Sequence, residues 1–145
     1  IAGSANTIMT GLDRIELVAG KGVVGDRYYK ETGTFSEILS GLPDKELTLI
    51  ESEKIDAFNE EFGFSYTYCD FRRNIVTQGI SLNDLAGKAI TIAGVRFYGV
   101  RLCEPCAHLA GLLTSEIMPA LVHKTGLRAQ IVKSGFIQIG DKLQV

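Results

Sequence analysis

The sequence contains no tryptophan, only three prolines and only three cysteines among its 145 residues. Three cysteines are an odd number and a poor basis for a disulfide framework. A domain of about this length buries roughly 68–70% of its unfolded surface and folds without such cross-links. With so few prolines, no proline-rich linker divides the chain. We therefore expect a single domain over residues 1–145.

The chain also lacks a surplus of basic residues. Fifteen lysines and arginines against seventeen aspartates and glutamates give a net charge of -2, whereas a nucleic-acid-binding surface needs an excess of positive charge. No apolar run approaches the roughly 20 residues of a membrane helix, and no basic, apolar leader opens the sequence. These absences predict a cytoplasmic protein that binds neither nucleic acid nor a membrane. Because the chain begins at Ile1 rather than at methionine, we expect its natural start to have been trimmed.

Glycine is the residue in excess, with 16 in the chain, and it separates short runs of β-prone residues. Many tight turns favour a fold of short strands. We expect strands at residues 15–18, 47–50, 74–77, 89–92, 95–98, 127–132, 136–139 and 142–145. The pairs Ala93-Gly94 and Ser134-Gly135 predict two hairpin turns. The expected fold is mostly β, of a β-rich α+β class: a closed or nearly closed β-barrel with peripheral short helices.

Two or three short helices are expected around this barrel. In the first, Ile55, Phe58 and Phe62 recur with helical spacing. Ser52 is its expected N-cap and Gly63 its stop. The other two helices are expected at residues 107–113 and 117–124.

The most concentrated candidate site is the segment 101–109, Arg-Leu-Cys-Glu-Pro-Cys-Ala-His-Leu, which follows an expected strand. A reactive thiol must be ionised at neutral pH, and nearby cations or the start of a helix favour its thiolate. Cys106 meets this condition because it follows Pro105 and precedes an expected helix. Arg101 and His108 add positive charge.

Three interpretations of these cysteines stay open. In the first, Cys106 is a reactive or metal-binding thiolate. The second is a zinc site formed by Cys103, Cys106, His108 and His123. A single C-x2-C with a distant histidine is a weak zinc signal, because structural zinc sites usually have two matched ligand pairs. In the third, both thiols are buried small hydrophobes, as free cysteines often are. The remaining cysteine, Cys69, stands among aromatic residues and is expected to pack.

A second candidate is the pair of arginines that precedes the strand expected at 74–77. Strand alternation would place Arg72 and Asn74 on one face and Arg73 on the other. A guanidinium and a carboxamide on one face form a fork for a phosphate or a carboxylate. The alternative, which the pattern alone favours, is a solvated charge pair with nearby Asp70.

The third candidate is the segment Gly20–Tyr28, in which glycines, Lys21 and Arg27 could form an anion-binding nest. It matches neither G-x-G-x-x-G nor a Walker A loop, so no nucleotide motif is present. Glycine and aspartate are also ordinary turn residues. The two histidines fall in no H-x-x-x-H or H-E-x-x-H pattern, and no Ser-His-Asp order stands out. A conventional hydrolase is therefore not expected.

Taken together, these segments resemble the MOSC domain, a family named after the C-terminal domain of molybdenum cofactor sulfurase. Five motifs occur in the family's order: an early G-D-R, a strand-to-helix segment, a central R-x-N-I-V stretch, a cysteine loop and closing motifs. In this sequence they are Gly25-Asp26-Arg27, Glu46 to Glu51, Arg72 to Thr77, Cys103 to Leu109, and Gly126 to Ala129 with Ile137 to Asp141. The similarity runs along nearly the whole chain.

The resemblance implies a strand-rich, barrel-like fold and a functional cysteine. In this family the cysteine is thought to carry sulfur as a persulfide or to ligate molybdenum in the molybdenum cofactor. By position it corresponds to Cys106, with Cys103 as a resolving or supporting thiol. The arginines and the asparagine that hold the cofactor's anionic groups in relatives correspond to Arg27, Arg72 and Asn74.

Arg101 and His108, on either side of that cysteine, complete the expected cofactor-binding set. The resemblance thus implies a stand-alone MOSC domain that carries sulfur or binds the molybdenum cofactor in sulfur–metal cofactor assembly. The chain has no pyridoxal-phosphate desulfurase domain, so the expected partners are a cysteine desulfurase or other sulfur donor, and the molybdenum cofactor or a molybdoenzyme as acceptor. Two alternatives remain open: a molybdenum-cofactor-dependent reductase of N-hydroxylated compounds, and a binding module that kept the fold without the chemistry.

Overall fold

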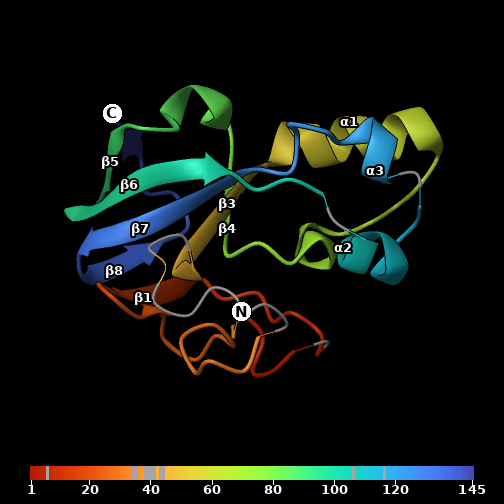
Figure 1. Cartoon of the computed structure of the whole chain (residues 1–145). Helices are drawn as coiled ribbons and strands as arrows, with labels where there is room; N and C mark the ends of the chain where they lie inside the picture. Colours follow the sequence, from red (N-terminus) through yellow and green to blue (C-terminus); the bar gives the residue numbers. More distant parts are fainter. Residues whose placement is uncertain (6, 34–35, 38–41, 43–44, 106, 116) are drawn as a thin grey trace.

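Two β-sheets and several short helices make up the part of the chain that the structure, a computed structural model, describes: residues 1–5, 7–33, 36–37, 42, 45–105, 107–115 and 117–145 (Figure 1). The strands are β1 (Arg14–Val18), β2 (Gly22–Val23), β3 (Leu47–Glu51), β4 (Ile75–Thr77), β5 (Ala89–Ile92), β6 (Val95–Leu102), β7 (Leu127–Lys133), β8 (Gly135–Gln138) and β9 (Leu143–Gln144). The α-helices are α1 (Ser52–Phe62), α2 (Ala107–Leu112) and α3 (Ile117–Ala120), and the 3-10 helices are η2 (Tyr68–Phe71) and η3 (Leu82–Leu85).

The larger sheet has the strand order β4-β3-β7-β6-β5-β9, and the smaller one has the order β2-β1-β8. Each strand runs antiparallel to its neighbours except in the pair β3 and β4, which is parallel because α1 lies between them in the chain. The sheets curl into a half-barrel, and the three α-helices gather at one end of it (Figure 1). The predicted fold, mostly β and barrel-like with short peripheral helices, is confirmed.

One of the two predicted hairpins forms. At Ala93-Gly94, Ile92 pairs with Val95, and the two turn residues have the positive φ angles, 50° and 81°, that a type I′ turn needs. The prediction of a hairpin at Ser134-Gly135 is wrong. One edge of β7 is bonded to β6, and the other is bonded to β3 and to the carboxylate of Glu46. The chain therefore crosses into the smaller sheet, where β8 pairs with β1.

The helices agree with the sequence in number and differ from it in their ends. Gly63 closes α1 in a left-handed conformation, as predicted. Ser52 is the first helical residue rather than the N-cap; Glu51 takes that position because β3 leads directly into the helix. The helix predicted over 117–124 is shorter, since α3 ends at Ala120. None of the helices among the described residues is long and apolar enough to span a membrane.

Strand β3 lies between two apolar cores. Leu49 belongs to the core that the two sheets share, together with Leu17 of β1 and Phe97 of β6. The next residue, Ile50, belongs to a second core beneath the helices, which includes Phe58 of α1. Because successive strand residues face opposite sides, β3 joins the barrel to the helical layer. Both candidate segments, the arginine motif and the cysteine loop, lie next to β3.

Glu46 connects the two sheets at the start of β3. Its side chain is buried, Oε2 accepts a hydrogen bond from the amide of Ile131 in β7, and Oε1 is buried with no hydrogen-bond partner among the residues that the structure describes. Burial raises the pKa of Glu46 above its ordinary value of 4.5, and the amides of Gly20 and Ile131 offset only part of this effect. The ionised carboxylate therefore costs stability at neutral pH.

Replacing Glu46 by glutamine is expected to stabilise the protein at alkaline pH relative to the wild type. The folded protein holds the Glu46 proton more tightly than the unfolded chain does, so the wild type loses stability as the pH rises from 4.5 through the higher folded-state pKa. Glutamine keeps the shape of the side chain and does not ionise. In urea unfolding, the advantage of Glu46→Gln should be larger at about pH 8 than at about pH 4. An advantage that does not change with pH would contradict the assignment.

Candidate functional site

Two arginines from distant parts of the chain meet beside one buried carboxylate. The side chain of Arg27 is buried, and its Nη2 donates to the backbone oxygen of Arg72 at 3.4 Å. Its Nη1 donates to Oδ1 of Asp26 at 3.2 Å. The guanidinium carbon lies 4.9 Å from the centre of the Tyr28 ring. The early G-D-R motif and the central arginine motif are therefore parts of one cluster.

Asp26, which the sequence did not single out as a site residue, holds this cluster together. It is 1% exposed. Oδ1 also accepts from the amide of Ala2 at 3.0 Å, and Oδ2 accepts from the amide of Tyr28 at 3.2 Å. A buried carboxylate needs such donors and a cation to replace its lost hydration. The signal for Asp26 in the sequence was its position next to Arg27. It was passed over because acidic residues in a glycine-rich turn usually face solvent.

Arg72 lies outside strand β4, in a left-handed conformation with φ of 60° that ends η2. The predicted strand alternation therefore does not apply to it. Its Nη1 donates to the backbone oxygen of Thr7, and its Nη2 is buried and has no hydrogen-bond partner in the described part of the chain. The alternative prediction, a charge pair with Asp70, does not hold. The Asp70 carboxylate instead accepts a hydrogen bond from the amide of Thr67 in a capping box.

The charges in this cluster do not balance. Among the described residues, Asp26 is the one acidic side chain that an ion pair or hydrogen bond links to either Arg27 or Arg72. Burial lowers the pKa of Arg72, and the positive charge of Arg27 lowers it further, although a guanidinium remains protonated at any ordinary pH. Two cations, one anion and an unused buried N–H donor form a site suited to a small anion.

Asn74 makes its contacts with β3 rather than with Arg72. Its Oδ1 accepts from the amide and the hydroxyl of Thr48, at 3.0 and 3.1 Å. The backbone amide of Asn74 donates to the hydroxyl oxygen and the carbonyl oxygen of Thr48. These bonds hold the beginning of β4 against β3. The fork that the sequence predicted between Arg72 and Asn74 is thus replaced by a strand-to-strand clamp beside the arginine cluster.

Arg101 lies across the larger sheet from Asn74. Thr48 of β3 is opposite Arg128 of β7, and Arg128 is opposite Arg101 of β6, so these three residues share one sheet face. Two strand spacings of roughly 4.8 Å separate Arg101 from Thr48. Arg128 lies between them and was missed as a site residue, although it stands in the Gly-Leu-Arg-Ala closing motif. The sheet face next to the cluster therefore carries two further arginines.

The beginning of the cysteine loop is tied to the strand that returns beside it. Cys103 is 2% exposed; its amide donates to the oxygen of Gly126 at 2.8 Å, and its carbonyl accepts from the hydroxyl of Thr125. Nε of Arg73 donates to the backbone oxygen of Thr125 at 3.0 Å, and its Nη1 donates to that of Phe71 at 3.2 Å. Arg73, which had no predicted role, thus connects the arginine motif to the cysteine loop.

The zinc interpretation is not tested, because the side chains of Cys106 and His108, two of its four ligands, lie outside the described residues. Nδ1 of His123 lies 2.8 Å from Oε2 of Glu104, and its amide donates to Oε1 of the same carboxylate. Within the described part of the chain, no three histidine, cysteine or acidic side chains gather as metal ligands. Cys103 is buried in the way expected of a small hydrophobe.

The central predicted residue, Cys106, lies outside the described residues. Its neighbours in the sequence are described: Pro105 is buried, and Ala107 begins α2. His108 lies in α2, and its side chain is outside the description. Cys69, predicted to pack, is half-buried in η2, directly before the arginine motif.

The comparisons with known proteins agree with this architecture. A family model described as the MOSC domain matches residues 36–144. Among solved structures, the YuaD protein of Bacillus subtilis has a TM-score of 0.78 at 16% identity, covering 97% of this chain and 90% of that one. YiiM of Escherichia coli has a TM-score of 0.69 at 16% identity, covering 94% and 66%. YiiM of Geobacillus stearothermophilus has a TM-score of 0.60 at 22% identity, covering 70% and 54%.

These likenesses show a shared fold. This chain spans between about half and two thirds of the length of the two YiiM proteins. The search of curated proteins found no match.

Proposed function

Because the chain belongs to the MOSC domain family, we propose that it carries sulfur as a persulfide on Cys106 or binds the molybdenum cofactor through that thiol. Arg27 and Arg72 bind the anionic part of the ligand. Asp26 holds Arg27 in place.

The observation that carries the proposal is the unused donor in the arginine cluster. Nη2 of Arg72 is buried with no hydrogen-bond partner among the described residues, and a buried N–H without an acceptor costs roughly 1–3 kcal/mol. The cluster also has one more positive than negative charge. A phosphate or carboxylate supplies an acceptor for the unused donor and also balances the excess positive charge, because its oxygens accept from a guanidinium in pairs.

The residues present fit the molybdenum cofactor, which has an anionic phosphate and takes thiolate as a ligand to its metal. Cys106 is the thiolate, and Arg27 and Arg72 hold the anionic group, with Asn74 positioning the arginine motif against β3. Arg101 and His108 supply further positive charge on the side of the cysteine loop. When bound, the cofactor supplies the redox chemistry of molybdenum.

The sulfur-carrier role needs a donor persulfide and no redox partner. The Cys106 thiolate forms a new S–S bond to the outer sulfur of the donor, the donor's own S–S bond breaks, and the donor cysteine leaves as a thiolate. The proton of the donor persulfide stays on the transferred sulfur. Positive side chains near the thiol favour this step because they stabilise the attacking thiolate.

The test is the molybdenum content of protein purified without oxygen from a host that makes the cofactor, followed by persulfide loading with a cysteine desulfurase and cysteine. Cys106→Ser is compared with Cys103→Ser, a matched change at the other thiol of the loop. We expect either near-stoichiometric molybdenum or a loaded persulfide, lost in Cys106→Ser and retained in Cys103→Ser. A protein that loads neither, or a Cys106→Ser variant that loads as the wild type does, overturns the proposal.

A molybdenum-loaded preparation is then assayed for reduction of N-hydroxylated compounds with an electron donor, which separates the reductase from the carrier.

Replacing Arg72 by glutamine removes the unused donor and one cation. We expect this change to weaken retention of the cofactor and to leave persulfide loading of Cys106 within about twofold, because the sulfur step has no bound phosphate.

A further inference from the structure

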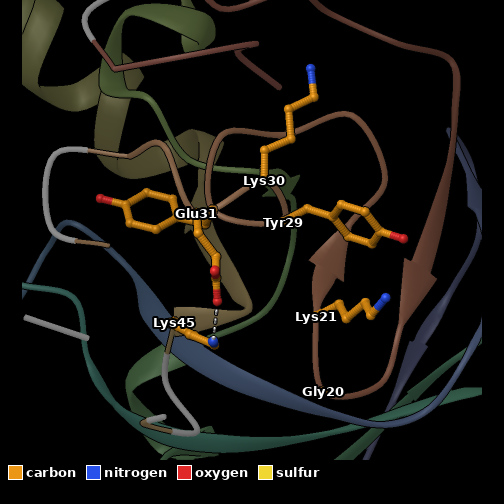
Figure 2. A pocket seen from close by; sticks show the side chains of 7 residues that line it. Gly20, Lys21, Tyr29, Lys30, Glu31 and Lys45 are labelled. Carbon is orange, nitrogen blue, oxygen red and sulfur yellow. Dashed lines mark ion pairs between the residues drawn. The ribbon is translucent and has the colours of Figure 1, made fainter. Parts of the chain in front are cut away.

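A cationic hollow lies beside the residues that follow the G-D-R motif (Figure 2). It has a volume of about 330 Å³, within the lower range of small-ligand sites. It opens between the turn that joins β1 to β2 and the residues that lead into β3. Its lining consists of Gly20, Lys21, Tyr28, Tyr29, Lys30, Glu31 and Lys45.

Lys45 is a largely buried charge in the lining of this hollow. Its side chain is only 16% exposed, and its ion pair is with Glu31, at 3.6 Å from Oε1. A charge-assisted hydrogen bond between an ammonium and a carboxylate is shorter, about 2.7–2.9 Å. The Glu31 side chain is 70% exposed, so much of its charge is screened by water. Lys45 is therefore a mostly buried cation with a loose partner.

Glu31 is held at this place by an uncommon backbone conformation. Its φ is 60°, in the left-handed region that residues other than glycine, asparagine and aspartate seldom adopt. Such strain at a residue with an exposed charge is typical of ligand-binding segments. Figure 2 shows the carboxylate of Glu31 directed towards the ammonium of Lys45.

The positive charge of the hollow comes from side chains rather than from a backbone nest. The nest predicted for Gly20–Tyr28 does not form, because the amides of that segment bond within the protein: those of Lys21 and Asp26, for example, donate to the backbone oxygens of Val18 and Val23. Three lysines and one glutamate remain in the lining. The ammonium of Lys21 lies 5.7 Å from the centre of the Tyr29 ring, so a flat aromatic surface adjoins the cations.

We propose that this hollow binds a small molecule that contains both a phosphate monoester and a planar ring. Lys45 binds the phosphate, Glu31 is displaced from Lys45, and Tyr29, beside Lys21, contacts the ring. The hollow adjoins the arginine cluster, because Tyr28 lines it and the Tyr28 ring also lies 4.9 Å from the guanidinium carbon of Arg27.

The test is titration calorimetry with AMP, inorganic phosphate and adenosine, which present the phosphate and the ring together or singly. AMP is expected to bind tightest, phosphate more weakly, and adenosine not measurably. Lys45→Gln should weaken AMP binding by about tenfold or more, as expected for the loss of a charge-assisted contact. The matched control is Lys133→Gln, an exposed lysine on β7, which should bind as the wild type does.

Glu31→Gln gives the sharpest outcome, because it should tighten phosphate and AMP binding by about two- to fivefold, the size of a partly exposed ion pair. A damaged fold cannot produce a gain in affinity. Cys106→Ser should bind AMP unchanged, which separates this proposal from the proposed function. The proposal is overturned if neither AMP nor phosphate binds, if adenosine binds as well as AMP, or if Lys45→Gln leaves affinity unaltered.

Discussion

Asp26→Ala is expected to lower the free energy of unfolding by about 3–5 kcal/mol, the usual cost of breaking a buried ion pair by removing one partner. The change leaves the guanidinium of Arg27, whose side chain is 8% exposed, without its carboxylate. It also removes the acceptor of the amides of Ala2 and Tyr28. Because a domain of this size is stable by only about 5–15 kcal/mol, the loss is large. Urea unfolding followed by circular dichroism measures it.

The control is Asp13→Ala, at an exposed aspartate of the same N-terminal region, which should change stability by no more than about 0.5 kcal/mol. Formate supplies the missing carboxylate, so it should restore part of the stability of Asp26→Ala. Chloride at equal ionic strength should restore less, because it cannot accept from a guanidinium in pairs. A loss below about 1 kcal/mol would show that Arg27 is not held by Asp26.

The barrel-like fold follows from local sequence because short β-prone runs alternate with glycine turns. The Ala93-Gly94 hairpin needs only local information, since a two-residue turn sets the register of its strands. Ser134-Gly135 carries the same signal and gives a crossover, because the partners of β7 come from residues that are far away in the sequence. Pairing between distant strands is the part of the fold that a local pattern does not determine.

In the candidate site too, local motifs could be predicted from the sequence, whereas contacts between distant residues could not. The motifs containing Arg27 and Arg72 could be chosen from the sequence, and the structure brings the two arginines together. Strand alternation failed at Arg72 because a 3-10 helix ends there in a left-handed residue. Asp26 and Arg73 were missed because their importance lies in burial and in bonds to distant backbone atoms. The one signal for Asp26 was its position next to Arg27, and nothing in the spacing or composition marked Arg73.

The arginine motif and the cysteine loop are mechanically coupled. Arg73 bonds to Thr125, the hydroxyl of Thr125 bonds to Cys103, and the amide of Cys103 bonds to Gly126. A displacement of the loop is therefore transmitted to the residue next to Arg72. The beginning of the cysteine loop, at Cys103, is thereby held beside the arginine motif.

Gly126→Ala is expected to lower the free energy of unfolding by about 4 kcal/mol or more, or to prevent folding. A Cβ atom at this position would lie 1.7 Å from the backbone oxygen of Leu49, far inside contact distance. The φ of 100° adds strain for any residue with a side chain. Both sides of the overlap are backbone, at the residue before β7 and in β3, so neither can turn aside. Urea unfolding and circular dichroism measure the effect.

Two other glycines separate the cost of the steric overlap from the cost of the positive φ. Gly111→Ala in α2 meets no atom within 4 Å and has no positive φ, so alanine should be neutral or stabilising by up to about 1 kcal/mol. Gly63→Ala also meets no atom but has a φ of 73°, so it should cost about 1 kcal/mol. If Gly126→Ala costs no more than Gly63→Ala, the close approach of β7 to β3 is not what requires glycine. A much larger cost assigns Gly126 to the packing that holds the cysteine loop against the barrel.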